Sequence, residues 1–219
     1  MPAVDRIIIS LSAVSAVAFL GQVQAPPSPK RALVKTSSTA LLALLALFRG
    51  GPALGVIALA LGSIGDWCLA FDGEAAFLGG LTHFLMAHLF YIRLFSQMAA
   101  RPGTELAYGL VPVAGWQAQA AAALGVLVVG MIGALVPRVP GGLRVPIVIY
   151  STAIFAMVLT ALAVDNDRIL AGALLFTTSD ALLAANQFLV GPKSSHRGWM
   201  QHSVWVSYYT AQLLIALEF

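Results

Sequence analysis

Two aspartates, Asp66 and Asp180, lie in stretches of sequence that are otherwise apolar enough to span a membrane. A carboxylate inside a bilayer costs about 2.5 to 3.5 kcal/mol even on lenient insertion scales, so a helix that carries one usually turns it toward a polar interior. The plainer explanation is that each side chain only forms a hydrogen bond with a neighbouring helix. Because the two aspartates stand in similar local sequences, we interpret them as two parts of one functional site.

Other polar residues are expected in the same half of the membrane as the aspartates. On the last apolar stretch, His202, Tyr209 and Gln212 follow a spacing that places them along one face of a helix. Each such side chain also has a structural explanation, as an interfacial aromatic residue, a snorkelling lysine or a histidine bonded between helices. Together they predict a polar cavity. The candidate residues around the aspartates are Lys35, His88, Tyr91, Tyr150, His202, Tyr209 and Gln212.

The chemistry indicated by this set is acid and base catalysis by two carboxyl groups, which can differ in protonation inside a low-dielectric pocket. The chain has neither the Gly-x-Ser-x-Gly motif of serine hydrolases nor the His-Glu-x-x-His motif of zinc peptidases. His83 and His88 are about 140° apart around a helix, a poor spacing for joint metal ligation. A metal held by His88, His202 and an aspartate stays an alternative, although no spacing argues for it. We expect no metal and no organic cofactor.

The composition places the chain among all-α, polytopic membrane proteins. Its 219 residues are 59% hydrophobic and 10% charged, whereas soluble domains are roughly 25% charged. The mean hydropathy is +0.88, and the long continuous apolar runs exclude a membrane β-barrel. The net charge of +3 indicates basic loops near anionic membrane lipids rather than nucleic-acid binding. A bacterial protein of this kind is expected in the inner membrane.

Eight apolar stretches are long enough to cross a bilayer, and we expect them to form one integral-membrane domain over residues 1–219. The first is interpreted as a retained span rather than a signal peptide. The segment Arg101–Trp116, punctuated by proline and glycine, is expected to form an interfacial helix or to lengthen the fifth span. The predicted spans are Ile7–Gln24, Leu33–Phe48, Pro52–Phe71, Ala75–Phe95, Ala118–Val136, Val145–Val164, Ile169–Val190 and Trp199–Leu217.

A faint internal repeat suggests two parallel four-helix halves. Asp66 and Asp180 are each followed three residues later by Leu-Ala. Spans three and seven cross the membrane in the same direction. At a rise of about 1.5 Å per residue, the two aspartates are expected roughly 8 and 15 Å from the same side, where they can meet. That side carries more lysine and arginine in its loops, which predicts a cavity mouth in the cytoplasm and both termini outside.

Four blocks of the sequence resemble the lysoplasmalogenase family, also called YhhN-like proteins. The resemblance covers the chain from about Lys35 to the C-terminus, in the expected order and with eight spans. Lys35 and Tyr150 also match polar positions of that family, although a threonine follows Lys35 where the family tends to have proline. The blocks are Gly65-Asp66-x-x-Leu69, Phe84-Leu-Met-Ala-His88-Leu-Phe-Tyr91, Gly172-Ala-Leu-Leu-Phe-Thr-Thr-Ser-Asp180-Ala-Leu-Leu-Ala and Tyr208-Tyr209-x-x-Gln212-Leu-Leu-Ile.

The resemblance implies that the substrate is a lysoplasmalogen and that its vinyl-ether bond is hydrolysed to a fatty aldehyde and a glycerophospho-base. Protonation of the alkene β-carbon generates an oxocarbenium ion, water adds, and the hemiacetal collapses. Asp66 and Asp180 would supply the acid, the negative charge and the base, by analogy with glycoside hydrolysis. Asp180, flanked by leucine and phenylalanine, is the expected donor. Lys35 would pair with the lipid phosphate or with Asp66, and the other candidates would orient water or substrate.

Two other functions stay open at this point. A transporter or lipid-binding membrane protein would use the carboxylates as proton or ion sites, although the helices around both aspartates lack the proline-broken centres that such sites often show. A metal-dependent hydrolase of lipid esters or amides, similar to ceramidases, would lose its activity to a chelator. Headgroup, chain length and oligomeric state do not follow from the sequence.

Overall fold

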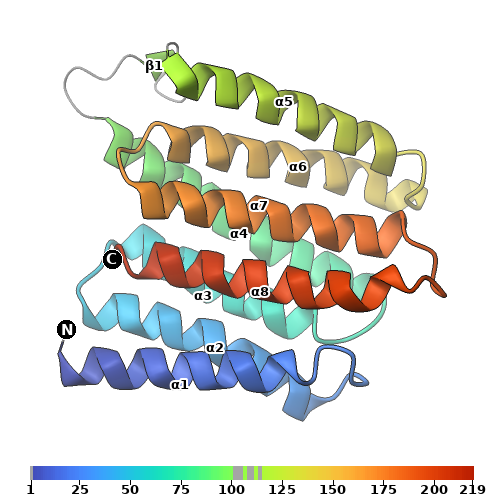
Figure 1. Cartoon of the computed structure of the whole chain (residues 1–219), viewed down its shortest axis with the longest axis horizontal. Helices are drawn as coiled ribbons and strands as arrows, with labels where there is room; N and C mark the ends of the chain where they lie inside the picture. The colour runs from blue at the N-terminus through green and yellow to red at the C-terminus, as the bar shows by residue number, and fades with distance from the viewer. Residues whose placement is uncertain (1, 101–105, 108–110, 113–114) are drawn as a thin grey trace.

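The protein is a bundle of helices that run back and forth along one direction (Figure 1). The computed structural model describes residues 2–100, 106–107, 111–112 and 115–219. Within these ranges the chain forms eight α-helices. They are α1 Ala3–Leu20, α2 Pro29–Phe48, α3 Ala53–Cys68, α4 Glu74–Ala99, α5 Gly115–Leu135, α6 Gly141–Leu162, α7 Asp167–Phe188 and α8 His196–Ala216.

The prediction of eight helices is confirmed, with ends that differ from the apolar pattern. Helices α2 and α7 begin earlier than predicted because polar residues form their first turns. The Ser28 side chain accepts a hydrogen bond from the backbone N–H of Arg31, and Pro29 occupies the first helical turn. The Asn166 side chain accepts hydrogen bonds from two backbone N–H groups at the start of α7. Hydropathy does not detect such capped polar turns.

The chain is a multi-pass integral membrane protein. Among the described helices, α1, α2, α4, α5, α6 and α7 are long and apolar enough to cross a membrane. Helix α3 is apolar but has only 16 residues, and α8 carries many polar side chains. That these two helices also span the bilayer stays a prediction, as do the single domain and the two parallel halves.

The helical expectation for Arg101–Trp116 is wrong for most of the segment's described residues. Leu106–Ala107 and Val111–Pro112 form two short antiparallel strands, β1 and β2, in which Leu106 pairs with Pro112. Proline lacks a backbone N–H and is tolerated at the edge of a ladder rather than inside a helix. Helix α5 begins at Gly115, three residues before the predicted start. The rest of the segment lies outside the described residues.

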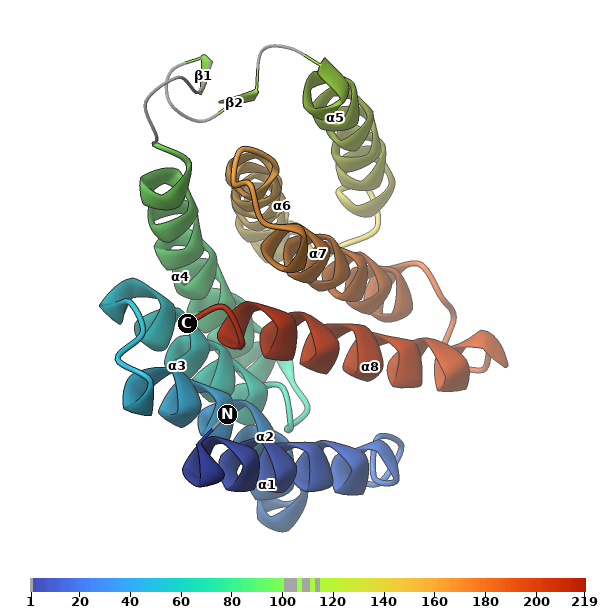
Figure 2. The same ribbon diagram turned by 60° about the vertical axis from the view of Figure 1, so that its left-hand side comes forward.

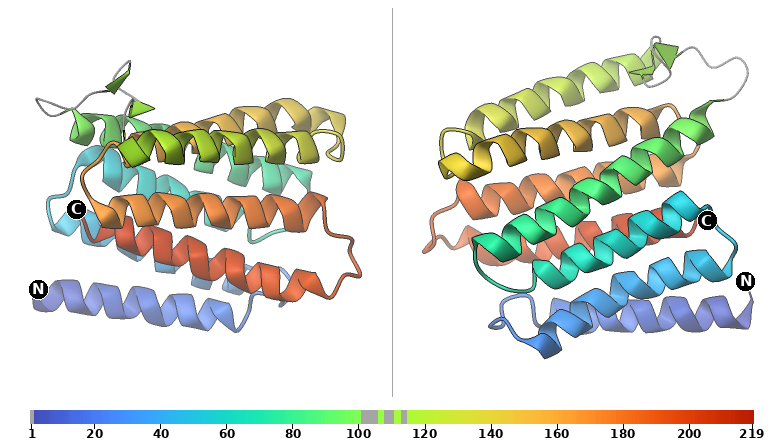
Figure 3. Two further views of the ribbon diagram at one scale, coloured as in Figure 1. Left: turned by 45° about the horizontal axis from the view of Figure 1, so that its top comes forward. Right: turned by 180° about the vertical axis from the view of Figure 1, so that it is seen from behind.

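Helices α4 and α8 occupy the middle of the bundle, and α5 lies at its rim. Helix α3 packs mainly on α2 and α4, α7 packs mainly on α8, and α4 also packs on α6. Figure 2 and the rear view in Figure 3 show α5 beside α6 at one side, far from α1 at the other. Helix α5 buries only Ala121 and Leu135. The bundle is therefore tightly packed around α4 and α8 and loosely closed at α5.

Two glycines let α3 approach its neighbours closely at the level of Asp66. A Cβ atom added to Gly65 would lie 2.8 Å from the ring of Phe84 on α4, and one added to Gly62 would lie 2.7 Å from the Gln212 side chain on α8. Both distances are shorter than real Cβ contacts. Gly65 thus lets α4 pack closely against α3, and this close packing helps to bury the neighbouring Asp66 side chain.

Candidate active site

Asp66, near the end of α3, is fully buried and bound by three side chains. Its Oδ2 atom accepts hydrogen bonds of 2.8 Å from the hydroxyl groups of Thr39 and Tyr208. The ammonium nitrogen of Lys35 lies 3.2 Å from Oδ1. Lys35 and Thr39 are one turn apart on α2, and Tyr208 comes from α8. The carboxylate therefore joins three helices through an ion pair and two hydrogen bonds, with no exposed surface of its own.

A second layer of buried polar groups supports this arrangement. The Gln212 amide nitrogen lies 3.3 Å from the Tyr208 hydroxyl oxygen, to which it donates, while its carbonyl oxygen accepts a 2.8 Å hydrogen bond from the Tyr91 hydroxyl. Gln212 and Tyr91 are fully buried. The chain of bonds thus runs from α3 through α8 to α4. We call Lys35, Thr39, Asp66, Tyr91, Tyr208 and Gln212 the Asp66 network.

Asp180, in α7, has a different environment. Its Oδ2 atom accepts a 2.9 Å hydrogen bond from the Tyr150 hydroxyl of α6. The Nε2 atom of His88, from α4, lies 3.7 Å from the same oxygen. His88 is fully buried, whereas the Asp180 side chain keeps 10% of its surface exposed. This carboxyl group therefore has one firm partner and one exposed edge.

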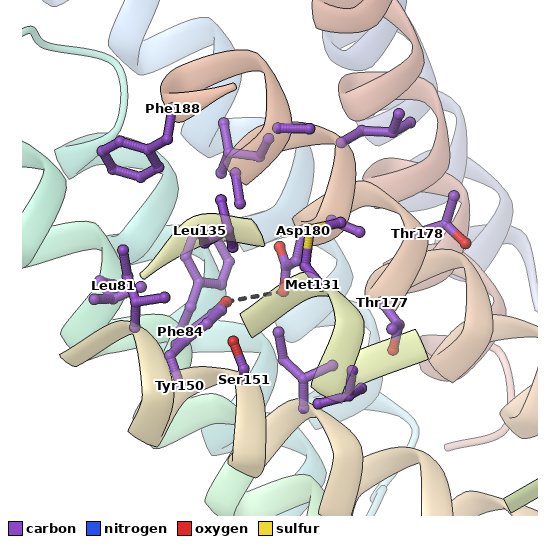
Figure 4. Close-up of a pocket in the computed structure, with 18 of the residues that line it drawn as sticks. Leu81, Phe84, Met131, Leu135, Tyr150, Ser151, Thr177, Thr178, Asp180 and Phe188 are labelled. Atoms are coloured by element: carbon purple, nitrogen blue, oxygen red, sulfur yellow. Dashed lines mark hydrogen bonds between the residues drawn. The ribbon is translucent and has the colours of Figure 1, made fainter. Parts of the chain in front are cut away.

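The exposed edge of Asp180 faces an apolar cavity of about 420 Å³ between α4, α5, α6 and α7. Figure 4 shows Asp180 and Tyr150 in its wall, joined by their hydrogen bond, among side chains such as Leu81, Phe84 and Met131. Ser151, Thr177 and Thr178 are its other hydroxyl groups. The wall is otherwise apolar, so the cavity can hold a hydrocarbon chain with a reactive bond beside one carboxyl group.

The cavity opens sideways, toward the face of the bundle that a bilayer would cover. Leu127 of α5 lines the cavity and is also 67% exposed, and Leu174 and Thr178 of α7 likewise line it and are exposed on the outside. The opening therefore lies between α5 and α7. We call it the α5–α7 mouth.

An aromatic cluster stands between the Asp66 network and the Asp180 cavity. The rings of Phe84, Phe176 and Tyr208 pack edge to face, with centroids 5.4 to 6.0 Å apart. Phe176 also packs against the His88 ring at 4.7 Å. Among the described residues, no hydrogen bond or ion pair joins Asp66 to Asp180. The two carboxyl groups are neighbours across a layer of aromatic rings and do not share one cavity.

Of the predicted candidates, Lys35, Tyr91 and Gln212 lie in the Asp66 network, and His88 and Tyr150 lie beside Asp180. Two lie elsewhere. The Tyr209 hydroxyl bonds to Ser12 of α1 at 2.9 Å, and the His202 ring bonds to a backbone carbonyl in its own helix. The network residue on this turn of α8 is Tyr208, which the sequence reasoning missed together with Thr39.

The signal for one of these two residues was present in the sequence. Thr39 stands four residues after Lys35 and so shares its helix face. Choosing Tyr208 over Tyr209 required the rotation of α8, because adjacent residues point about 100° apart around a helix. Among the described residues, no group of three or more histidine, cysteine, aspartate and glutamate side chains is arranged to hold a metal ion.

Comparisons with known proteins agree with the blocks described above. The model of the YhhN family matches residues 30–219. A Mycobacterium tuberculosis protein named lysoplasmalogenase is 31% identical over 168 residues, which are 75% of this chain and 59% of that relative. The human lysoplasmalogenase TMEM86B is 31% identical over 161 residues, 74% of this chain and 61% of the human protein. The chain thus spans about three fifths of the length of these relatives. No solved structure is significantly similar to it.

Proposed function

The chain belongs to the YhhN family, and from this membership we propose that it hydrolyses the vinyl-ether bond of lysoplasmalogens to a fatty aldehyde and a glycerophospho-base. The observation that carries the proposal is a carboxyl group, Asp180, at the wall of an otherwise apolar cavity. Its volume of about 420 Å³ falls in the range of small-molecule sites, roughly 300 to 1,000 Å³. Such a cavity suits a lipid with one hydrocarbon chain.

In the proposed reaction, Asp180 acts first as an acid and then as a base. It gives its proton to the β-carbon of the alkene, whose π electrons form the new C–H bond and leave an oxocarbenium ion. The Asp180 carboxylate, still bonded to the Tyr150 hydroxyl, lies beside this cation and stabilises it. Water then adds to the cationic carbon and returns a proton to the carboxylate. Collapse of the hemiacetal releases the aldehyde and the glycerol hydroxyl.

We propose a supporting role for Asp66 rather than a shared chemical step. Asp66 is fully buried, is paired with Lys35 and lies behind the aromatic cluster. The Asp66 carboxyl group is enclosed by an ammonium group and two donating hydroxyl groups and does not line the cavity, so it has no contact through which to pass a proton to a substrate there. The Asp66 network instead fixes Tyr208, whose ring packs against Phe84 in the cavity wall. Of the two partners expected for Lys35, this geometry favours Asp66 over the lipid phosphate.

The bond that the protein cleaves provides the direct test. Purified protein is expected to release fatty aldehyde from a 1-alkenyl lysolipid, detected by mass spectrometry. The matched 1-alkyl lysolipid lacks only the double bond, so it should occupy the cavity without turnover and act as a competitive inhibitor. The 1-acyl lysolipid should resist, because the chain has no Gly-x-Ser-x-Gly motif for attack on an ester. Activity should survive EDTA.

Two outcomes would overturn this assignment. Release of fatty acid from the 1-acyl lysolipid as fast as aldehyde from the 1-alkenyl lysolipid would make the protein an esterase. Loss of activity on chelation, with recovery on adding zinc, would move the reaction to a metal-dependent mechanism. In either case Asp180 would lose the role proposed here.

A bulky side chain in the α5–α7 mouth is expected to slow the enzyme. Thr178→Trp places an indole where the cavity meets the outside. The value of kcat/KM should fall by at least about tenfold, because the hydrocarbon chain of the lysolipid can no longer enter. Thr152→Trp is the matched control. Thr152 of α6 is also exposed and also bonds to the carbonyl four residues earlier, but it does not line the cavity. Equal activity of the two variants would exclude access through this mouth.

A further inference from the structure

Three histidines in the described helices form the same local hydrogen bond. The Nδ1 atom of His83, of His88 and of His202 lies within bonding distance of the backbone carbonyl oxygen four residues earlier. A carbonyl oxygen only accepts hydrogen bonds, so Nδ1 carries the ring hydrogen in each case. In the neutral ring, Nε2 is then an unprotonated acceptor.

His88 differs from the other two in what its Nε2 atom faces. This atom is buried and has no hydrogen-bond partner among the described residues. Asp180 Oδ2 lies 3.7 Å from it. Edge-to-face contacts with Phe176 and Tyr150 hold the ring in this orientation. The lone pair of the His88 ring therefore faces an oxygen of the Asp180 carboxyl group. A hydrogen bond between the two groups requires that the carboxyl group carry the proton.

We propose that His88 keeps Asp180 protonated in the resting protein, as a positioning residue for the acid. The unprotonated Nε2 atom, 3.7 Å from Oδ2, would accept a hydrogen bond from the carboxylic acid once the two groups move a few tenths of an ångström closer. It has no hydrogen bond to offer to the carboxylate, so it favours the acid form. This inference rests on the proposed function and adds to it. It explains how a carboxyl group that also accepts a hydrogen bond from Tyr150 stays available as a proton donor.

The charged and titratable groups around this pair support the assignment. From α6, Tyr150 donates to Asp180, and the residues that α5 contributes to the cavity wall are apolar. Tyr208 of α8 lies beyond Phe176 and is bonded to Asp66, which is itself paired with Lys35. Within the described part of the chain, the close ionisable contacts of His88 and Asp180 are each other and Tyr150.

The same contact acts after the proton has left. When the β-carbon takes the proton, Asp180 becomes a carboxylate that faces the His88 lone pair and the substrate cation. Since His88 offers this carboxylate no hydrogen bond, the carboxylate is a stronger base and takes a proton back from the attacking water. Asp180 therefore carries one proton at the start of the cycle and one proton at its end, and the proton on His88 Nδ1 does not take part. The alkene carbon gains one proton and the water loses one.

His88→Gln tests the inference because a glutamine amide can donate a hydrogen bond to the carboxylate. Donation favours the charged form, so Asp180 should lose its proton at lower pH. Activity requires the protonated acid and falls as pH rises through that point, so the fall in kcat should move to lower pH by about one unit. The inhibition constant of the 1-alkyl lysolipid should stay unchanged. His83→Gln, on the same helix with the same local bond, should keep the parent profile.

A second substitution separates this role from a purely structural one. His88→Met fills similar space but removes the acceptor and adds no donor, so the fall in kcat should move to lower pH, by less than in His88→Gln. An equal drop in kcat in both His88 variants, with the fall at the same pH as in the parent, would mean that His88 only packs the site. A parent protein that cleaves no alkenyl lysolipid at all would instead refute the proposed function.

An infrared measurement tests the inference without turnover. At neutral pH the parent protein should show the C=O band of a protonated carboxylic acid that disappears in Asp180→Asn. The band should weaken in His88→Met, which lacks the acceptor, and weaken further in His88→Gln, which adds a donor. Absence of the band from the parent would overturn the proposal, whatever the variants do.

Discussion

Asp180→Asn is expected to lower kcat by at least about 100-fold while the protein keeps its fold. Removing a general acid typically costs a factor of 10² to 10⁴, and an amide cannot protonate an alkene carbon. The substitution keeps the shape of the side chain and the oxygen that accepts from Tyr150, so neither the cavity nor its neighbours need to move. Aldehyde release from the 1-alkenyl lysolipid measures kcat, and thermal unfolding in detergent measures the fold.

The matched control is Asp167→Asn, the same substitution in the first turn of the same helix, away from the α4–α7 cavity. It should leave kcat within about twofold of the parent, because surface substitutions rarely disturb a distant site. Inhibition by the 1-alkyl lysolipid should be equal in the parent and in both variants. A well-folded Asp180→Asn protein that keeps more than about a tenth of the activity would remove Asp180 from the mechanism.

Replacing either Lys35 or Asp66 alone is expected to lower the free energy of unfolding more than any other substitution proposed for this protein. Asp66→Asn leaves a mostly buried ammonium group without its counter-charge, and Lys35→Met leaves a fully buried carboxylate without its own. Breaking a buried ion pair from one side typically costs about 3 to 5 kcal/mol, because the remaining charge stays desolvated. Each single variant should therefore unfold at a clearly lower temperature than the parent.

The double variant Lys35→Met/Asp66→Asn should recover most of this loss, since it leaves no unpaired charge and the asparagine oxygen can still accept from Thr39 and Tyr208. The control is the pair of Arg168, which is exposed, and Glu218, which is half-buried, with their charged groups 2.9 Å apart. Breaking it should cost about 0 to 1 kcal/mol. The double variant also tests the role of Asp66. A stable but inactive double variant would restore the two-carboxylate mechanism expected from the sequence.

The sequence predicted the eight helices and five of the side chains that lie near the two aspartates, because both follow from local pattern. A long apolar stretch predicts a membrane-spanning helix, and a charged residue inside such a stretch is easily recognised in the sequence. Lys35 and Tyr150, both candidates from the sequence, lie beside Asp66 and Asp180 respectively. The division into two sites could not be predicted, because it depends on which aromatic rings fill the space between α3 and α7. Phe84 and Phe176 give no sign in the sequence that they separate the carboxyl groups.

Helix rotation is the second property that local pattern could not supply. Helix α8 has neighbours on several sides, so polar and apolar residues occur around most of its circumference and its periodicity is weak. Tyr208 and Tyr209 are chemically identical, and only the position of α3 decides that Tyr208 reaches Asp66 while Tyr209 reaches Ser12. The two short strands β1 and β2 were missed because strands of two residues have no periodicity.

For the proposed reaction, the α5–α7 mouth has a consequence for how the kinetics must be described. Because Leu127, Leu174 and Thr178 line the cavity and are exposed on the side that a bilayer would cover, the protein would meet the proposed lysolipid as a solute of the bilayer. The substrate concentration that sets the rate is then the mole fraction of lysolipid among the membrane lipids. The lysolipid concentration per volume of water does not set it. Adding inert phospholipid at a constant total amount of substrate should slow turnover by surface dilution. The long-chain aldehyde would leave by the same path, so it should be recovered with the vesicles.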